Sequence, residues 1–172
     1  MKIHKCIRLF VSLILIGFFM LYMNNDIGTY KSNIEKDARA SHQIPDDCKV
    51  AKQTTDTMSA MLFYNEDFSD NSFSIYVNRD GLSFGYFFRG GGSIGSINDG
   101  IAELHIDGYN ERAFISMNRK QVNKVEVDNG QVVEIIEIDS TKPFVFILPT
   151  NAGVVRIYDI NNNLVTSTEE WL

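Results

Sequence analysis

Residues 122–138 read VNKVEVDNGQVVEIIEI, and this stretch carries the clearest fold signal in the chain. Valines recur among polar residues over 122–128, and a second run of β-branched residues fills 131–138. Alternation with a period of two is typical of a strand that buries one face. Asp128-Asn129-Gly130 separates the two runs, and an Asn-Gly pair is typical of a hairpin turn. The stretch therefore predicts a β-hairpin.

The same texture continues on both sides of this hairpin, from residue 58 to residue 172. Short apolar or alternating runs are separated by turn residues, which is the pattern of a chain built from short strands. We expect strands at 58–65, 72–78, 82–88, 101–107, 112–118, 122–128, 131–138, 143–148, 154–160 and 164–167. The side chains expected to face the core are Phe73, Ile75, Val77, Ile115, Met117, Val125, Val127, Val133, Ile135, Phe144, Phe146 and Leu148.

Ten short strands in about 115 residues favour an all-β domain with two packed sheets. The expected fold is a mostly β, antiparallel β-sandwich of the immunoglobulin-like kind. A small closed barrel is the alternative. No apolar stretch of this region keeps a 3.6-residue period over a helix-sized length, so no helix is expected there.

The N-terminus has a different character, because residues 9–23 (LFVSLILIGFFMLYM) carry no charge. With Cys6, Ile7 and a snorkelling Arg8 the run approaches the roughly 20 residues that a membrane span needs. Basic residues occur only on its N-terminal side, which predicts a cytoplasmic N-terminus. A cleaved signal peptide and secretion are the alternative, although no small-x-small site follows closely.

Four segments follow from these patterns. Residues 1–8 are expected in the cytoplasm, 9–23 as a transmembrane signal-anchor helix, 24–57 as a polar stalk, and 58–172 as an extracytoplasmic β domain. The stalk is polar and mixed in charge, with one or two helical turns expected near 34–39. Its Cys48 is predicted to be an inert thiol, with an intermolecular disulfide as the alternative.

Charge separates the segments further and excludes one class of partner. The net charge of −6 divides into +3 for residues 1–23, −1 for 24–57 and −8 for 58–172. Phosphate backbones repel an acidic domain, so no nucleic-acid binding is expected. Two cysteines and three histidines leave little for a zinc site, and no metal or cofactor is predicted.

The densest local motif is Arg89-Gly90-Gly91-Gly92-Ser93-Ile94, which predicts a flexible glycine-rich loop that joins two strands. Exposed loops often carry binding, so this loop is also the candidate contact with a ligand or partner. It overlaps the G-x-S-x-G pattern of a nucleophile elbow through Ser93. That pattern requires a helix directly after the serine, and none is expected. For this reason a hydrolase is only the alternative function: a small extracytoplasmic enzyme that uses Ser93 with His105, the one histidine of the predicted β domain.

The leading functional hypothesis is a single-pass, non-enzymatic surface protein. Its domain would bind an envelope protein or a cell-wall component, and the membrane would hold it through residues 9–23. A further alternative is an accessory sensor domain for another membrane protein, because about eight cytoplasmic residues are too few to signal alone.

Overall fold

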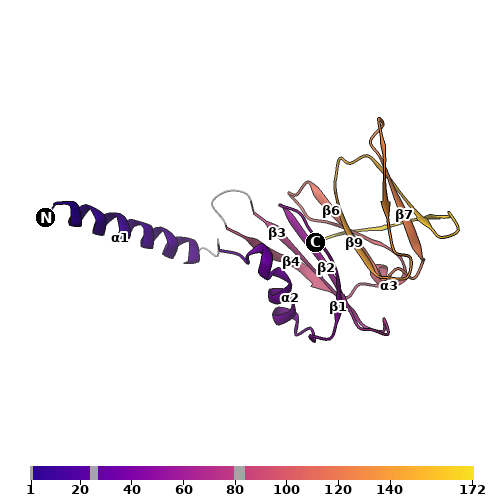
Figure 1. Cartoon of the computed structure of the whole chain (residues 1–172), viewed down its shortest axis with the longest axis horizontal. Helices are drawn as coiled ribbons and strands as arrows, with labels where there is room; N and C mark the ends of the chain where they lie inside the picture. Colours follow the sequence, from indigo (N-terminus) through magenta and orange to yellow (C-terminus); the bar gives the residue numbers. More distant parts are fainter. Residues whose placement is uncertain (1, 24–26, 80–83) are drawn as a thin grey trace.

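The computed structural model describes residues 2–23, 27–79 and 84–172. The chain is mostly β, as predicted, with twelve strands in this described part (Figure 1). The helical elements are α1 (Lys2–Met23), the 3-10 turn η1 (Lys31–Asn33), α2 (Ile34–His42) and α3 (Gly95–Asp99). The strands are β1 (Lys49–Thr54), β2 (Met58–Tyr64), β3 (Asn71–Asn78), β4 (Tyr86–Gly92), β5 (Ala102–His105), β6 (Glu111–Ser116), β7 (Val122–Asp128), β8 (Val133–Glu137), β9 (Phe144–Pro149), β10 (Val154–Asp159), β11 (Leu164–Val165) and β12 (Thr168–Trp171).

The strands form three four-stranded sheets. Sheet I has the order β1-β2-β3-β4, sheet II has β12-β5-β6-β9, and sheet III has β11-β10-β7-β8. Every strand pair is antiparallel except β12 with β5, which is parallel. Each described sheet has two open ends, so the barrel alternative is wrong. The expected two layers are also too few, because a third sheet is present.

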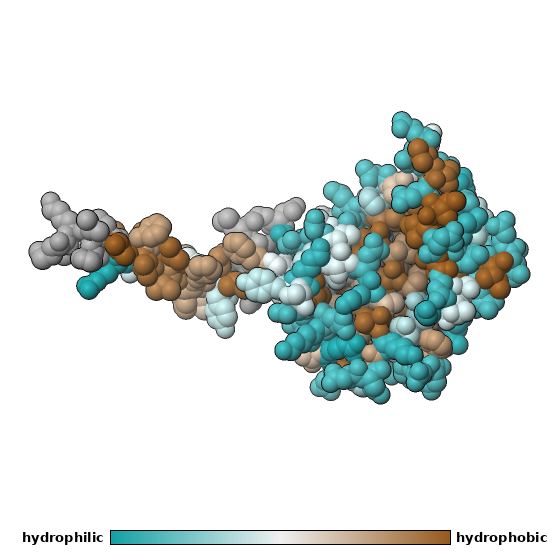
Figure 2. Space-filling view, viewed as in Figure 1, coloured by the Kyte–Doolittle hydropathy of each residue, from teal (hydrophilic) through white to brown (hydrophobic). Residues whose placement is uncertain are grey.

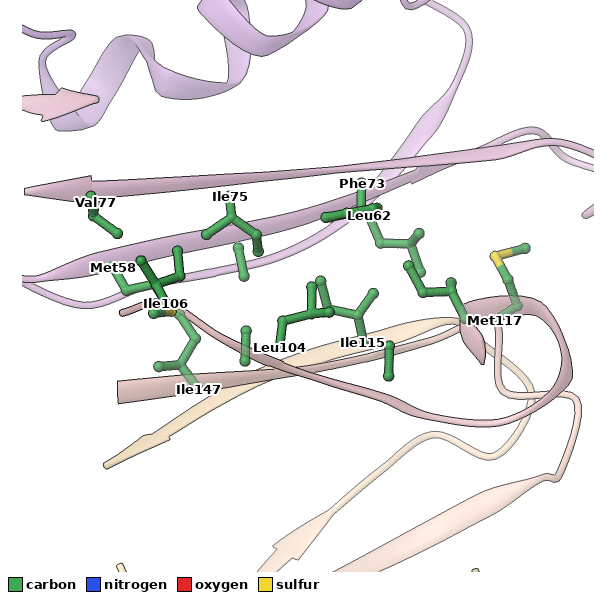
Figure 3. Close-up of a cluster of buried hydrophobic side chains, with 14 of the residues drawn as sticks. Met58, Leu62, Phe73, Ile75, Val77, Leu104, Ile106, Ile115, Met117 and Ile147 are labelled. Atoms are coloured by element: carbon green, nitrogen blue, oxygen red, sulfur yellow. The ribbon is translucent and has the colours of Figure 1, made fainter. Parts of the chain in front are cut away.

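Sheets I and II enclose the first core, which Figure 3 shows as two facing rows of apolar side chains. Alternate residues of β2 and β3 meet alternate residues of β5 and β6, because side chains of a strand point to opposite faces in turn. The labelled members are Met58, Leu62, Phe73, Ile75, Val77, Leu104, Ile106, Ile115, Met117 and Ile147.

Sheets II and III enclose a second core on the other face of sheet II. Its buried members are Ile101, Phe114, Val122, Val125, Val127, Phe144, Phe146, Leu148 and Ile157. Phe114 and Phe146 stack with ring centroids 4.6 Å apart. Sheet II therefore has apolar residues on both faces, with sheet I on one side and sheet III on the other.

The predicted division at residue 57 is wrong, because part of the stalk belongs to the folded domain. Strand β1 pairs with β2 along its whole length, and α2 covers the outer face of sheet I. Ile34 and Ala38 of α2 are buried against Phe63 and Tyr76. This packing explains why all seven residues of β2 are buried, since both faces of that strand are covered.

The guanidinium of Arg39 holds the segment after α2 in place. It donates hydrogen bonds to the carbonyl oxygens of Pro45 (2.9 Å) and Cys48 (3.0 Å) and lies 5.0 Å from the ring centroid of Phe63. It also pairs with Glu35, one turn earlier on α2. Polar contacts of this kind carry no apolar periodicity, so no sequence pattern predicts them.

The apolar segment 9–23 lies within α1, which extends away from the sheets (Figure 1). Its large apolar side chains are exposed, and Figure 2 shows the resulting apolar surface. In the described part of the chain, no helix is long and apolar enough to cross a membrane. The predicted membrane-spanning helix is therefore corrected to an apolar α-helix.

The strand predictions after residue 58 are largely confirmed, with differences at β8 and β4 and with β12 not predicted. Val133 and Ile135 are 49% and 54% exposed, although both were predicted to face the core. The register of β8 explains this, because Ile136 lies opposite the buried Val125 and turns its neighbours outward. The strand predicted at 82–88 begins outside the described residues, and the observed strand β4 continues beyond it to Gly92.

Candidate functional site

The candidate site is a cleft of about 330 Å³ between sheets II and III. The C-terminal segment that leads from β11 to β12 forms one side of it. The residues that line it are Glu103, Arg112, Phe114, Gly153, Val155, Arg156, Ile157, Leu164, Val165, Thr166, Ser167 and Glu169. Charged groups and apolar groups therefore share one concave surface, as in many ligand sites.

Glu103 is the buried charge of this cleft, with 7% of its side chain exposed. Its Oε1 accepts a hydrogen bond of 2.6 Å from Nη1 of Arg112, and its Oε2 accepts one of 2.7 Å from the hydroxyl of Ser167. A buried carboxylate needs such partners, because an unpaired charge in the interior is very costly. The hydrogen bond from Ser167 to Glu103 also ties the C-terminal segment to sheet II.

Strand register places the charged groups together. Glu103 lies opposite Glu169 of β12, and His105 lies opposite Trp171 of β12 and Arg112 of β6. Paired residues of neighbouring strands point to the same face of a sheet. Leu104, between the two, points to the first core, so all five residues point to the face that sheet III adjoins.

His105 and Trp171 lie beside the cleft. Their rings stack with centroids 4.7 Å apart and planes inclined by 22°. The indole of Trp171 is 68% exposed, whereas 13% of the His105 side chain is exposed. Trp171 therefore shields the imidazole and still presents its other face to solvent.

The cleft also contains unsatisfied hydrogen-bonding capacity. Nε of Arg112 is buried without a hydrogen-bond partner, and the guanidinium lies 5.4 Å from the ring centroid of Phe114. A buried donor without a partner costs free energy, which a ligand oxygen placed in the cleft would recover. Val155 and Ile157 add apolar walls from β10. The surface suits a ligand with both hydroxyl groups and apolar faces.

The predicted loop Arg89–Ile94 lies elsewhere, and most of it is strand. Gly90, Gly91 and Gly92 belong to β4, at the edge of sheet I, and Arg89 is the extra residue of a β-bulge opposite Ile75 and Tyr76. A Cβ on Gly91 would lie 2.7 Å from the carbonyl oxygen of Phe73, so close strand packing accounts for this glycine. Ser93 and Ile94 follow the strand.

The expectation that no helix follows Ser93 is wrong, because α3 begins at Gly95. The helix has only five residues, and Ile97 anchors it in the first core. Ser93 makes no hydrogen bond to His105 within the described residues, and the imidazole instead lies between Glu103 and Trp171. The structure therefore does not assemble the proposed pair of Ser93 and His105.

Cys48 lies outside the cleft, with no disulfide partner within the described residues of the chain. Burial, followed by the charge of Asp47, raises the pKa of this thiol above its ordinary value. A raised pKa leaves less thiolate at neutral pH, which reduces reactivity. The intermolecular disulfide stays an untested alternative.

The sequence interpretation missed Glu103, Arg112, Glu169 and Trp171. One signal was present, because Glu103 and His105 alternate within the strand prediction 101–107 and so had to share a face. Strand β12 (TEEW) has no apolar alternation, so its pairing with β5 had no local signal. Comparison of the chain with protein-family models, curated proteins and solved structures finds no match.

Proposed function

We propose that this protein is a non-enzymatic binding protein of the cell envelope, and that its inter-sheet cleft binds a polyhydroxylated cell-wall component. The observation that carries the proposal is the arrangement around Glu103. Two carboxylates and the unpartnered Nε of Arg112 lie on the same face of sheet II as the exposed indole of Trp171. That the β domain has an immunoglobulin-like β-sandwich fold stays a prediction.

A glycan chain matches this surface better than a protein partner does. Sugar rings offer hydroxyl groups to charged side chains and apolar C–H faces to aromatic rings. An exposed tryptophan supplies a large, rigid contact with a small loss of conformational entropy. The cleft volume of about 330 Å³ suits one or two rings of a longer chain rather than a broad protein surface.

A non-enzymatic role fits the polar groups of the site. Oε1 of Glu103 already pairs with Arg112, and its Oε2 accepts the Ser167 hydroxyl. A general acid or base must exchange a proton with its substrate, which these contacts hinder. Ser93 and His105, the other candidates, do not form a hydrogen-bonded pair.

Location is the second part of the proposal. Most large apolar side chains of the described part of α1 are 43% to 70% exposed, which is unfavourable in water. We place α1 in contact with membrane lipid and the β domain on the extracytoplasmic face. A membrane-impermeant maleimide tests this in a Cys6→Ser variant. Labelling of Cys48 in intact cells supports the location, and labelling only after lysis contradicts it.

The chain offers a built-in probe of the cleft, because Trp171 is its one tryptophan. We would titrate the full chain in detergent with soluble cell-wall glycan fragments and follow tryptophan fluorescence. A saturable change supports the proposal. No change with any fragment, at concentrations up to the millimolar range, contradicts it.

Two arginine variants test whether the ligand binds in the cleft or at the predicted segment Arg89–Ile94. Arg112→Gln removes the charge beside Glu103, whereas Arg89→Gln removes an exposed charge at the edge of sheet I. The cleft proposal expects at least tenfold weaker binding for Arg112→Gln and unchanged binding for Arg89→Gln. The reverse result would move the binding site to Arg89–Ile94.

A further inference from the structure

The side chains of Glu103, His105 and Glu169 form a cluster with the composition of a metal site. Each offers one ligand atom, and the three atoms lie within 4.8 Å of one another. Two neighbouring strands supply them, since Glu103 and His105 come from β5 and Glu169 comes from β12. Residues on paired strands have fixed backbone positions, which favours a defined site over a chance gathering of acids.

The spacing of the first two ligand atoms is informative. Nε2 of His105 lies 3.3 Å from Oε1 of Glu103, yet this buried nitrogen makes no hydrogen bond. Zinc binds nitrogen and oxygen at about 2.0–2.2 Å in a tetrahedral arrangement, which places two ligand atoms about 3.3–3.5 Å apart. The imidazole and the carboxylate therefore already have the separation of two ligands of one ion.

The third ligand and the open position complete the arrangement. Glu169 is exposed, so its carboxylate can rotate toward the other two without unpacking a core. Three protein ligands leave a fourth position for water or a ligand oxygen. We propose that Glu103, His105 and Glu169 bind a divalent transition-metal ion of the zinc type at the edge of the cleft.

The ligand set selects among cations. Imidazole suits zinc and its first-row neighbours, whereas calcium and magnesium prefer oxygen ligands alone. Arg112 acts beside the site, because its hydrogen bond of 2.6 Å to Oε1 of Glu103 fixes the carboxylate. Its positive charge also opposes the incoming cation, so the affinity is expected to be lower than that of a site without it.

Trp171 makes the proposal measurable, because it stacks on His105 at 4.7 Å. Paramagnetic Co²⁺ bound to the imidazole would quench the fluorescence of this one tryptophan. We would titrate the full chain in detergent with Co²⁺ and then add Zn²⁺ as a competitor. The expected result is saturable quenching that Zn²⁺ reverses, with about one Zn²⁺ per chain by equilibrium dialysis.

Three variants separate a built site from general metal association. Glu169→Gln keeps the stacked rings and removes one ligand, and His105→Ala removes another. Each is expected to weaken Co²⁺ binding at least tenfold, because loss of an outer partner alone costs about that much. His42→Ala, on α2, is the matched control and is expected to leave the affinity unchanged.

Several results would overturn the metal site. These are quenching that does not saturate, quenching that Zn²⁺ does not reverse, or equal effects of the His42 and Glu169 variants. The inference does not rest on glycan binding, and the glycan titration is done with a chelator present. Failure of one proposal is therefore distinguishable from failure of the other.

Discussion

The two faces of sheet II differ in what they enclose. Toward sheet I, Leu104, Ala113 and Ile115 lie in a buried apolar core. Toward sheet III, apolar residues such as Phe114 occupy one part of the face, and Glu103 and Arg112 occupy the rest. Residues adjacent in sequence therefore serve a sealed core on one side and a cleft on the other.

This difference shows how one strand can stabilise the fold and build a site together. Successive side chains alternate between faces, so Glu103 and His105 sit among apolar neighbours without entering the first core. Burial of the charges is tolerated because Arg112 and Ser167 satisfy Glu103. Packing of the first core fixes the strands of sheet II, and these strands hold the charged groups of the cleft in position.

Truncation in the sealed core should have the largest effect on stability. Ile115 is fully buried between sheets I and II. Ile115→Ala should lower the free energy of unfolding by about 2–5 kcal/mol, because it removes buried methyl groups and leaves a cavity. Urea unfolding of the variant measures this. A loss below about 1 kcal/mol would contradict the view that the face toward sheet I is the tightly packed one.

Removal of the charge in the cleft should have an intermediate effect. Glu103→Gln breaks the ion pair with Arg112 and should cost about 1.5–3 kcal/mol, as for a lost hydrogen bond to a charged group. Glu169→Gln, at an exposed position on the same face, should change stability by less than about 0.5 kcal/mol. Equal effects of the two variants in urea unfolding would contradict a special role for Glu103.

Acid should weaken the α2 side of sheet I by a smaller amount. The hydrogen bonds from Lys52 and then Arg39 outweigh partial burial and hold the pKa of Glu35 below its ordinary value. The folded state therefore binds this proton less readily, so the contribution is present above the unfolded pKa of about 4.3 and is lost as pH falls.

The Glu35 contribution is expected to be about 1 kcal/mol or less, as for a partly exposed ion pair. Unfolding of the chain and of Glu35→Gln should be measured between pH 7 and pH 3. The stability difference between them should shrink toward the acid end. A difference that stays constant with pH would show that the ion pairs of Glu35 contribute nothing that titrates.

Substitution of Trp171 should have the smallest effect on stability and a clear effect on binding. Its ring is 68% exposed, so Trp171→Phe should change the free energy of unfolding by less than about 0.5 kcal/mol. Glycan affinity, measured by calorimetry, should fall about tenfold, as expected for an aromatic contact residue. Unchanged affinity would remove the indole from the proposed site.

The comparison of prediction with structure follows the same division. Local alternation and the Asn-Gly pair predicted β7, β8 and the turn between them, because these signals lie within one short stretch of sequence. The face of β8 was predicted wrongly, since Val132 and Val133 are adjacent, as are Ile135 and Ile136, and either register buries apolar groups. Pairing with Val125 of β7 resolves this choice.

Strands β1 and β12 escaped prediction for a related reason. Their sequences, KVAKQT and TEEW, have little apolar alternation, and both lie at the end of a sheet. In β1 only Val50 and Ala51 are apolar, and both pack against buried clusters, whereas β12 is joined to sheet II mainly through its pairing with β5. The neighbour is far along the chain for β12, which pairs with β5.

By itself, the sequence determined a mostly β chain with an apolar N-terminal segment and an acidic domain, since composition and short-range periodicity carry that information. Only the tertiary structure decided that Glu103, Arg112, Glu169 and Trp171 meet. Their contacts join β5, β6 and β12, and Ser167 reaches Glu103 from 64 residues away. No local pattern encodes such a contact, because it depends on which sheet edge the last strand joins.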